Sequence, residues 1–437
     1  MPTLPLAGKR VIELGTMLAA PFASHILSQL GAEVIKVEPP RGDPTRSLVR
    51  GGPSGTFIAY SHGKKSACID LSSEEGHGAF RALLSTADIL VHNLAPRAAR
   101  KLRLTHEDCK AINPRLVYCH IRGYAAGPQA DDLASNPVAE AATGVMEGNR
   151  IGDRPSRLGP SYHDQFAGAY AVIGILGALL RAGAGEEPGP VEVGLYETGL
   201  HVASRDLVGM QLKTRLLGRP EREPNGEFSM PGYGAYLTAD QRWLYLLMLT
   251  DAHWLKFCAA MALPQARDES LATLRQRKKR HQEVEDIVRA AIAAHTFQQA
   301  TDRLKAAGVG TTEVLPLERV LDAPQARHPG KLRHVPFRQF DFEVPEFPAV
   351  PSAHAVPGTL PPPDLGADTL DLLREAGLGA AECEKLLAAG AIAEARPGHF
   401  AWAPVRPAGT GAGTSGESGP GRPSAQPGQS AQPGQSA

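Results

Sequence analysis

Short apolar runs alternate with amphipathic segments along the N-terminal part of the chain. Runs without regularly spaced polar positions predict buried strands at residues 10–14, 34–38, 67–71, 88–92 and 116–121. Amphipathic stretches between them predict helices, one at residues 21–30 with Pro21 in its first turn, and one opened by a capping box of Ser72 and Glu75. Strands that alternate with helices indicate an α/β fold with a parallel sheet covered on both faces.

A long uncharged stretch follows, from residue 166 to residue 180. It ends at Arg181, about five residues short of the ~20 that a bilayer requires, so we expect no membrane span. Small residues such as Gly168 and Gly174 allow neighbouring elements to approach closely, which favours a helix buried in a protein core. After it, the pattern predicts a strand at residues 190–193 and an amphipathic helix at residues 195–212.

The pattern changes beyond residue 218. Residues 218–226 are polar and rich in Gly and Pro, which predicts a linker. Two alternating segments joined by a short turn predict an antiparallel hairpin, and amphipathic stretches predict three helices: residues 234–238 and 243–249, then 251–262, 281–295 and 297–307. These elements describe a smaller α+β domain. Its basic run at residues 275–280 is interpreted as a solvated surface segment, because the chain carries no net charge.

The C-terminal part divides into three segments. Residues 321–363 are rich in Pro and predict an extended chain, whereas residues 369–376 and 380–388 predict two short helices. From about residue 405 to residue 437 the sequence is almost entirely Gly, Pro, Ser, Ala, Gln and Thr. Such a composition cannot bury a core, so we expect this tail to be disordered and dispensable.

Composition narrows the functional classes. The chain has 437 residues, with 46 basic residues balancing 46 acidic ones and a pI near 7.3. This balance favours a small-molecule partner over nucleic acid or an anionic membrane. Five scattered cysteines form no CxxC pair, so we expect neither a disulfide framework nor a metal site, and a reducing compartment fits best. We therefore predict a cytoplasmic protein.

Asp164 is the strongest catalytic candidate. It lies where a loop containing Gly159 and Pro160 gives way to the uncharged stretch, near the positive end of a helix dipole that favours the ionised carboxylate. Such a carboxylate can be a nucleophile toward an activated carbonyl, and it can equally be an ordinary helix N-cap. The loop at residues 15–21 has no G-x-G-x-x-G, and no Walker motif occurs, so a dinucleotide or nucleoside triphosphate site is not expected.

Several ordered segments resemble one known family. They include Leu-Gly-Ala-Glu-Val-Ile-Lys-Val-Glu-Pro-Pro and Ala-Asp-Ile-Leu-Val-His-Asn-Leu, and they lie at residues 5–14, 30–40, 42–46, 63–71, 87–94 and 113–118. In these segments the chain is similar to the class III CoA-transferases, the CaiB/BaiF family that includes formyl-CoA and carnitine CoA-transferases, over residues 4 to about 390. In that family the Asp of an Asp-x-x-x-Gly element is the nucleophile, and Asp164 with Gly168 matches it. The resemblance favours the catalytic role of Asp164, with which capping is compatible.

The resemblance also implies a site for coenzyme A. Around the adenosine and pantetheine it places residues of the strand-end loops: Met17, Leu18, Ile69, Leu71, Asn93, Leu94 and Ala95. Lys101 would meet a phosphate, within a basic cluster that also contains Arg97, Arg100 and Arg103. A flexible loop would carry Gly226, Gly232 and Gly234, which either donate backbone N–H groups to the site or serve only as linker glycines. Three positions depart from the family pattern: Leu94, Arg97 and the pair Ser61–His62.

The implied architecture is a Rossmann-like parallel-sheet large domain built from N- and C-terminal parts, plus a smaller α+β domain, in an interlocked ring-like homodimer. We expect the N-terminal part of the large domain at residues 1–212, a linker at 213–227 and the small domain at 228–320. Residues 321–403 form a second linker and return to the large domain, and residues 404–437 form the tail.

The implied activity is CoA transfer from an acyl-CoA to a carboxylic acid, with coenzyme A as substrate and no permanently bound cofactor. Two alternatives remain open. An acyl-CoA racemase or epimerase would use a His and an Asp as proton carriers; its usual His position holds Ser135, although His163 adjoins Asp164. A CoA-binding subunit of a hetero-oligomeric transferase would perform no chemistry itself. The sequence identifies neither the donor acyl-CoA nor the acceptor acid.

Overall fold

The computed structural model describes residues 4–49, 52–218, 230–349 and 360–395. Its centre is a seven-stranded sheet in the order β14-β3-β2-β1-β4-β5-β8. The strands are β1 (Arg10–Leu14), β2 (Glu33–Glu38), β3 (Lys65–Ile69), β4 (Ile89–His92), β5 (Val117–Arg122), β8 (Val191–Gly194) and β14 (Ile392–Ala393). All neighbours are parallel except β14, which runs antiparallel to β3. The predicted α/β class with a mainly parallel sheet is therefore confirmed.

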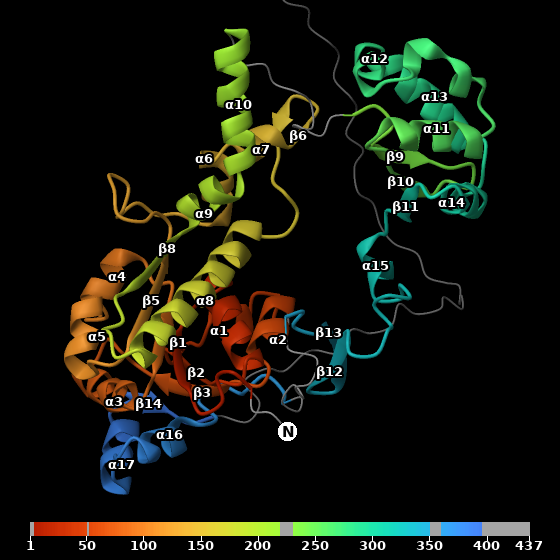
Figure 1. Ribbon diagram of the computed structural model, residues 1–437. Coiled ribbons are helices and arrows are strands. Elements are labelled where there is room, and N and C mark those ends of the chain that lie inside the picture. The colour runs from red at the N-terminus through yellow and green to blue at the C-terminus, as the bar shows by residue number, and fades with distance from the viewer. Residues whose placement is uncertain (1–3, 50–51, 219–229, 350–359, 396–437) are drawn as a thin grey trace, which may run out of the picture.

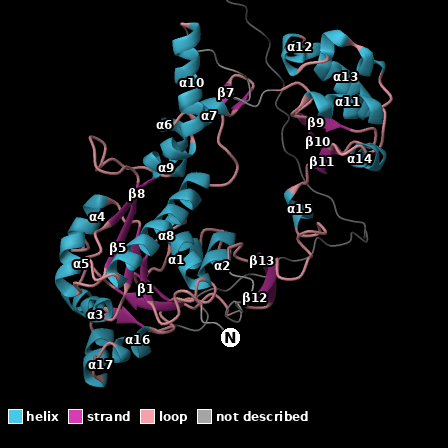
Figure 2. Cartoon of the chain, in the orientation of Figure 1, coloured by secondary structure: helices cyan, strands magenta, loops and turns pink. Residues whose placement is uncertain are grey.

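Helices cover both faces of this sheet (Figures 1 and 2). On one face Ile12, Ile35 and Leu90 pack with Phe80 and Leu83, and on the other Val11, Val34 and Val91 pack with residues such as Leu27 and Ile175. The helices of the first face are α3 (Glu74–Ser85), α4 (Pro96–Lys101), α5 (His106–Ile112), α16 (Thr369–Glu375) and α17 (Ala380–Ala388). Those of the second face include α1 (Ala19–Gln29), α6 (Asn136–Ala142) and α8 (Tyr162–Gly183).

Helix α8 is longer than the apolar run predicted. It spans 22 residues, so by length and composition it is the one helix among the described residues that could cross a bilayer, which is weak evidence because a core helix passes the same test. The length argument against a span was wrong, because the helix begins at Tyr162. The expected burial holds for one face only: Ala171 and Ile175 are buried, whereas Ile173 and Leu180 are exposed.

Other N-terminal elements also differ in detail from the prediction. Helix α3 is capped by Ser73, whose hydroxyl accepts a hydrogen bond from Gly76 N, so the capping box at Ser72 was wrong. The predicted helix at residues 195–212 is two helices that meet at Ala203, α9 (Leu195–Val202) and α10 (Ser204–Leu217). The remaining short elements are α2 (Gly55–Ser61), α7 (Val145–Gly148), β6 (Arg150–Ile151) and β7 (Arg154–Pro155).

The smaller α+β unit stands apart from the sheet domain (Figure 1). Its antiparallel sheet has the order β11-β10-β9, and its buried centre contains Trp254, Phe257 and Val288. The elements are β9 (Gly234–Leu237), β10 (Trp243–Leu247), β11 (Gly310–Glu313), α11 (Asp251–Ala260), α12 (Leu274–Lys279), α13 (His281–Ala293) and α14 (Phe297–Ala306). The predicted hairpin and three helices are confirmed. One residue of the basic run, Arg277, is 1% exposed and pairs with Asp251, so that run is not wholly a surface segment.

The Pro-rich return path is more ordered than predicted. It contains α15 (Leu317–Val320) and a two-stranded hairpin of β12 (Leu332–Phe337) and β13 (Phe340–Pro345). The hairpin buries Val335 and Phe337 against Phe57 of α2, with the two phenyl centroids 6.3 Å apart. These two strands are extended, as expected for residues 321–363, but their pairing into a hairpin was not predicted. Residues 219–229, most of the predicted linker, and the C-terminal tail from residue 396 lie outside the described residues.

Candidate active site

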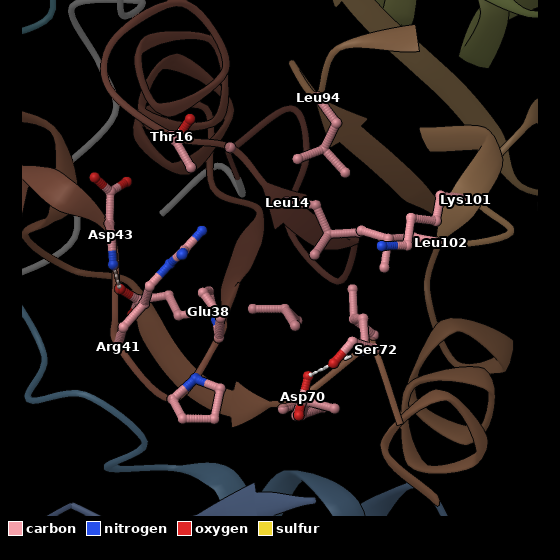
Figure 3. A pocket seen from close by; sticks show the side chains of 16 residues that line it. Leu14, Thr16, Glu38, Arg41, Asp43, Asp70, Ser72, Leu94, Lys101 and Leu102 are labelled. Atoms are coloured by element: carbon pink, nitrogen blue, oxygen red, sulfur yellow. Dashed lines mark hydrogen bonds between the residues drawn. The ribbon is translucent and has the colours of Figure 1, made fainter. Parts of the chain in front are cut away.

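A pocket of about 650 Å³ opens at the carboxyl ends of β1 to β4, where open α/β sheets bind ligands. Figure 3 shows side chains from the loops that follow these strands converging on it. The lining residues are Leu14, Gly15, Thr16, Val37, Glu38, Pro39, Pro40, Arg41, Asp43, Ile69, Asp70, Leu71, Ser72, Leu94, Lys101 and Leu102. More than half of these residues are apolar or glycine; Arg41 and Lys101 are basic, and Glu38, Asp43 and Asp70 are acidic.

Half of the residues expected around coenzyme A line this pocket: Ile69, Leu71, Leu94 and Lys101. The other half do not line the pocket: Met17, Asn93 and Ala95 are next to lining residues in the chain, and Leu18 is two residues after the lining residue Thr16. Asn93 has a bracing role, because its amide donates to Thr16 O and accepts from Thr16 N, both at 2.9 Å. It thereby ties the loop after β1 to the end of β4.

The sequence prediction missed several polar lining residues. Arg41 is an exposed guanidinium after β2, and Ser72 donates a hydrogen bond to Asp70 after β3. Their position directly after predicted strands was the available signal, because ligands gather at strand ends. Within the predicted basic cluster, Arg100 pairs with Asp131 and Arg103 pairs with Glu74. Lys101 is therefore the member of the cluster that the structure brings to the pocket.

Asp164 lies in the first turn of α8, not at its N-cap. The N-cap is Ser161, whose side chain makes no capping hydrogen bond, so the N-cap interpretation of Asp164 was wrong. Capping comes instead from Asn136 of α6, whose Oδ1 accepts from His163 N at 2.9 Å and from Asp164 N at 3.3 Å. The first N–H groups of α8 thus find their hydrogen-bond acceptor on a side chain that is distant in the sequence.

Burial dominates the electrostatics of this carboxyl group. It raises the pKa of half-buried Asp164 to about 6, while the guanidinium of Arg157 lowers it and the carboxylate of Glu140 raises it further. Near neutral pH the group is therefore ionised and more basic than an ordinary aspartate. A carboxylate of this kind is suited to attack on a thioester carbonyl.

Gly168 lies one helical turn after Asp164 and packs on the start of α1. A Cβ atom at Gly168 would lie 2.8 Å from Ala19 O and 3.0 Å from Phe22 Cδ1. Only a glycine allows α8 to approach α1 this closely. Since α1 follows directly on the loop that carries Thr16, this contact sets the position of Asp164 relative to the pocket-forming loop.

The imidazole of His163 lies against Thr143 and Gly199. Its Nε2 lies 3.2 Å from Thr143 Oγ1, and that hydroxyl donates to Ala139 O, so the ring nitrogen is the donor. A Cβ at Gly199 would be 2.5 Å from the same nitrogen, which shows how tightly α9 covers the ring. Burial lowers the pKa of His163, and the neutral imidazole is enclosed between α6 and α9.

The glycines expected in a flexible loop are only partly described. Gly226 lies outside the described residues. The N–H of Gly232 donates to Glu285 Oε1 at 2.8 Å, and that carboxylate also accepts from Tyr236 Oη. In the described chain the N–H of Gly232 is therefore engaged within the small domain. Gly234 begins β9.

A buried ionic network lies beneath the strand ends. Glu13 of β1 is fully buried and accepts from Lys36 Nζ and Lys64 Nζ, each at 2.6 Å. Burial raises the pKa of Glu13, but the two ammonium groups outweigh it and lower the value to about 2. Lys64 also donates to Pro21 O at 3.0 Å, so the network fixes the start of α1.

The family model described as CoA-transferase family III matches residues 6–369. The chain therefore belongs to CoA-transferase family III, as the sequence resemblance indicated, and it is a CoA-transferase by class. It is 31% identical over 333 residues to succinyl-CoA–D-citramalate CoA-transferase of Chloroflexus aurantiacus, across 74% of this chain and 81% of that enzyme.

Two further comparisons bear on assembly and fold. The chain is 30% identical over 394 residues to the beta subunit of succinyl-CoA–L-malate CoA-transferase of Chloroflexus aurantiacus, across 85% of this chain and 94% of the subunit. Its fold is similar to the crystal structure of a CAIB/BAIF family protein from Brucella suis. That match has a TM-score of 0.75 and 25% identity, and it covers 86% of this chain and 100% of the other.

Proposed function

We propose that this chain transfers CoA from an acyl-CoA donor to a carboxylic acid through covalent intermediates on Asp164. The single observation that carries the proposal is the half-buried carboxylate of Asp164, which two elements hold in place. Asn136 accepts hydrogen bonds from the backbone beside it, and Gly168 seats its helix against α1 next to the pocket-forming loop. A nucleophile needs this kind of fixed position relative to its substrate.

The chemistry proceeds by acyl exchange. A carboxylate oxygen of Asp164 attacks the thioester carbonyl, the C–S bond breaks, and CoA thiolate leaves a mixed anhydride behind. The thiolate then attacks the aspartyl carbonyl, which releases the donor acid and forms an aspartyl-CoA thioester. The acceptor carboxylate attacks this thioester, and the released thiolate attacks the acceptor acyl carbon of the new anhydride. The product acyl-CoA leaves and Asp164 is regenerated.

For coenzyme A we propose that the strand-end pocket receives the nucleotide end, with Ile69, Leu71 and Leu94 on its apolar wall. Lys101 and Arg41 supply positive charge for the phosphates. Met17, Leu18, Asn93 and Ala95 support or border the same site from the adjoining loops. The relatives named above act on succinyl-CoA with citramalate or malate, so succinyl-CoA is the first donor to test and hydroxy-dicarboxylic acids are the first acceptors.

We also propose a homodimer, interlocked as in the family resemblance, with the domain ranges given above. Apolar residues on α10, including Met210, Leu212 and Leu216, are exposed in the single chain, and the small domain stands apart from the sheet (Figure 1). All five cysteines are buried free thiols, which suits a reducing cytoplasm. Light scattering at micromolar concentration should give about twice 46 kDa; a stable monomer, or activity only with an unlike subunit, would refute the homodimer.

The direct test uses Asp164→Asn. The amide keeps the size of the side chain but cannot form an anhydride, so acyl exchange should be lost while the unfolding midpoint is kept or raised. Asp371→Asn is the matched control, because Asp371 also lies in the first turn of a helix, on the exposed surface. Hydroxylamine or borohydride trapping after incubation with succinyl-CoA should change the mass of the wild-type peptide containing Asp164 and of no other peptide.

The same experiment separates the alternatives. A racemase would exchange the substrate α-proton with solvent deuterium and form no covalent adduct. The His163 imidazole is enclosed by Thr143 and Gly199, and consecutive residues of a helix do not face each other, so this arrangement supports CoA transfer over racemisation. A well-folded Asp164→Asn protein with full CoA-transfer activity would overturn the proposal.

A further inference from the structure

Glu140 is a completely buried acid close to Asp164. It is 0% exposed, and both of its carboxylate oxygens accept hydrogen bonds, one from Asn136 Nδ2 and the other from Leu158 N at 3.2 Å. Among the residues that the structure describes, the cation paired with it is Arg157, whose Nε lies 3.9 Å from Oε2 and whose side chain is 46% exposed. A buried charge with so distant a counter-ion is costly, which calls for a reason beyond stability.

The carboxylate of Glu140 determines which way the amide of Asn136 points. An ionised carboxylate can only accept hydrogen bonds, so Asn136 must turn its NH₂ group toward Glu140. The amide oxygen then points in the opposite direction, toward His163 N and Asp164 N at the start of α8. A flipped amide would set its NH₂ group against the two backbone N–H donors and its oxygen against the Glu140 carboxylate. The orientation of Asn136 therefore depends on Glu140.

We propose that Glu140 is a positioning residue for CoA transfer, acting through Asn136 to hold the backbone of Asp164 and, by its charge, to keep that carboxylate reactive. The inference rests on the proposed role of Asp164 as nucleophile. It adds a residue that does not touch the reacting atoms. The Asn136 and Glu140 side chains lie four residues apart on α6 and so face the same side of the helix.

The charges around Asp164 determine in which direction its pKa should change when each of them is removed. Burial is the main cause of its raised pKa; Glu140 raises it further, and Arg157 opposes both. Other charged groups on the helices packed against α8 are engaged elsewhere: Glu197 of α9 accepts from Ala125 N at 3.0 Å, and burial keeps His25 of α1 neutral at physiological pH. Removing the charge of Glu140 should therefore lower the pKa of Asp164, and removing that of Arg157 should raise it.

Carbodiimide labelling measures this without requiring turnover. The reagent attacks protonated carboxyl groups, so the extent of labelling of the Asp164 peptide against pH, read by mass spectrometry, gives the protonation midpoint. Glu140→Gln should move the midpoint downward and Arg157→Gln should move it upward, each by on the order of one pH unit or less. Glu147→Gln is the control, because Glu147 is a nearby exposed acid on α7 and should leave the midpoint unchanged.

Kinetics and a swapped pair test the positioning step. Glu140→Gln leaves either Asn136 Nδ2 or Leu158 N without an acceptor, so kcat should fall roughly tenfold to a hundredfold while KM for acyl-CoA stays within about twofold. The double variant Asn136→Asp with Glu140→Gln restores every hydrogen bond: the Gln amide donates to Asp and its oxygen accepts from Leu158 N. That pair should recover most of kcat even if Glu140→Gln alone folds poorly.

The outcomes are distinguishable from failure of the proposed function. If the wild type transfers no CoA, the labelling midpoints still report whether Glu140 and Arg157 act on Asp164 in opposite directions. Equal midpoints for the wild type and Glu140→Gln, an unchanged kcat in that variant, or a swapped pair no more active than the single variant would each overturn the inference.

Discussion

The contact of Gly168 with α1 provides a quantitative test of how Asp164, the proposed nucleophile, is positioned. Helix α8 contains another interior glycine, Gly177, where an added Cβ would have no neighbour within 4 Å. At Gly168 the same atom would lie 2.8 Å from the carbonyl oxygen of Ala19, which is backbone and cannot rotate aside. The two positions therefore receive an identical chemical change in one helix but differ in surroundings.

The expected free energies follow from this difference. Replacing an interior helical glycine by alanine stabilises a helix by about 0.5–1 kcal/mol, and Gly177→Ala should gain that amount. Gly168→Ala gains the same helix propensity but also overpacks the contact with α1, which costs about 1–3 kcal/mol. The propensity contribution cancels between the variants, so the difference in unfolding free energy between them measures the overpacking alone.

Denaturant unfolding followed by circular dichroism measures this difference, provided that the two variants have equal m values, the slopes of unfolding free energy against denaturant concentration. The activity assay should separate them further, since α8 must shift by a few tenths of an ångström in Gly168→Ala and carries Asp164 with it. We expect kcat to fall in Gly168→Ala and to stay at the wild-type value in Gly177→Ala. Equal stabilisation of both variants, or equal kcat, would refute the argument that Gly168 sets the approach of the two helices.

Three further predictions concern charge. Burial raises the pKa of Asp164 to about 6, and the proposed nucleophile is the ionised form, so kcat/KM should rise as the pH increases through about 6. Asp164→Asn should raise the unfolding midpoint at pH 8, where the wild type buries a charge, but not at pH 4, where the wild-type carboxyl group is protonated. Lys101→Ala should increase KM for acyl-CoA several-fold in a salt-dependent manner with kcat retained, whereas Arg100→Ala, which loses only its exposed pair with Asp131, should not. Glu13→Ala leaves two buried lysines without their shared carboxylate and should cost about 3–5 kcal/mol of unfolding free energy; a loss below about 1 kcal/mol would contradict the role assigned to this network.

Local patterns were sufficient for most of the sheet domain. Strand β4 is an apolar run as far as His92, and β1 is apolar apart from Arg10 and Glu13; that property belongs to the segment itself. The hairpin β12–β13 was missed because Pro336 and Pro345 read as breakers. Proline is tolerated there because each strand of a two-stranded ribbon has a partner on one side only, which leaves positions where no N–H is required.

The burial of charged side chains could not be predicted from the sequence, for a different reason. Arg277 belongs to a basic run that reads as solvated, yet its guanidinium donates to Leu271 O, Ala272 O and Asp251. These acceptors come from other turns and from the start of α11. Whether a charge can be buried depends on acceptors that tertiary structure supplies, and no property of the run itself records them.

The candidate site was likewise predicted only in part from the sequence. The position of Asp164 was found from its motif, and the strand ends that form the pocket followed from the α/β pattern. The groups that hold and surround Asp164 come from the segment that starts at Asn136 and ends 27 positions later at His163, a stretch with little regular structure beyond α6. The only sequence signal was the spacing of four between Asn136 and Glu140, which places two polar side chains on one face of a short helix. The role of that face depends on α8 beginning beside it. The N–H groups in the first turn of α8 need an acceptor that the Ser161 side chain does not supply.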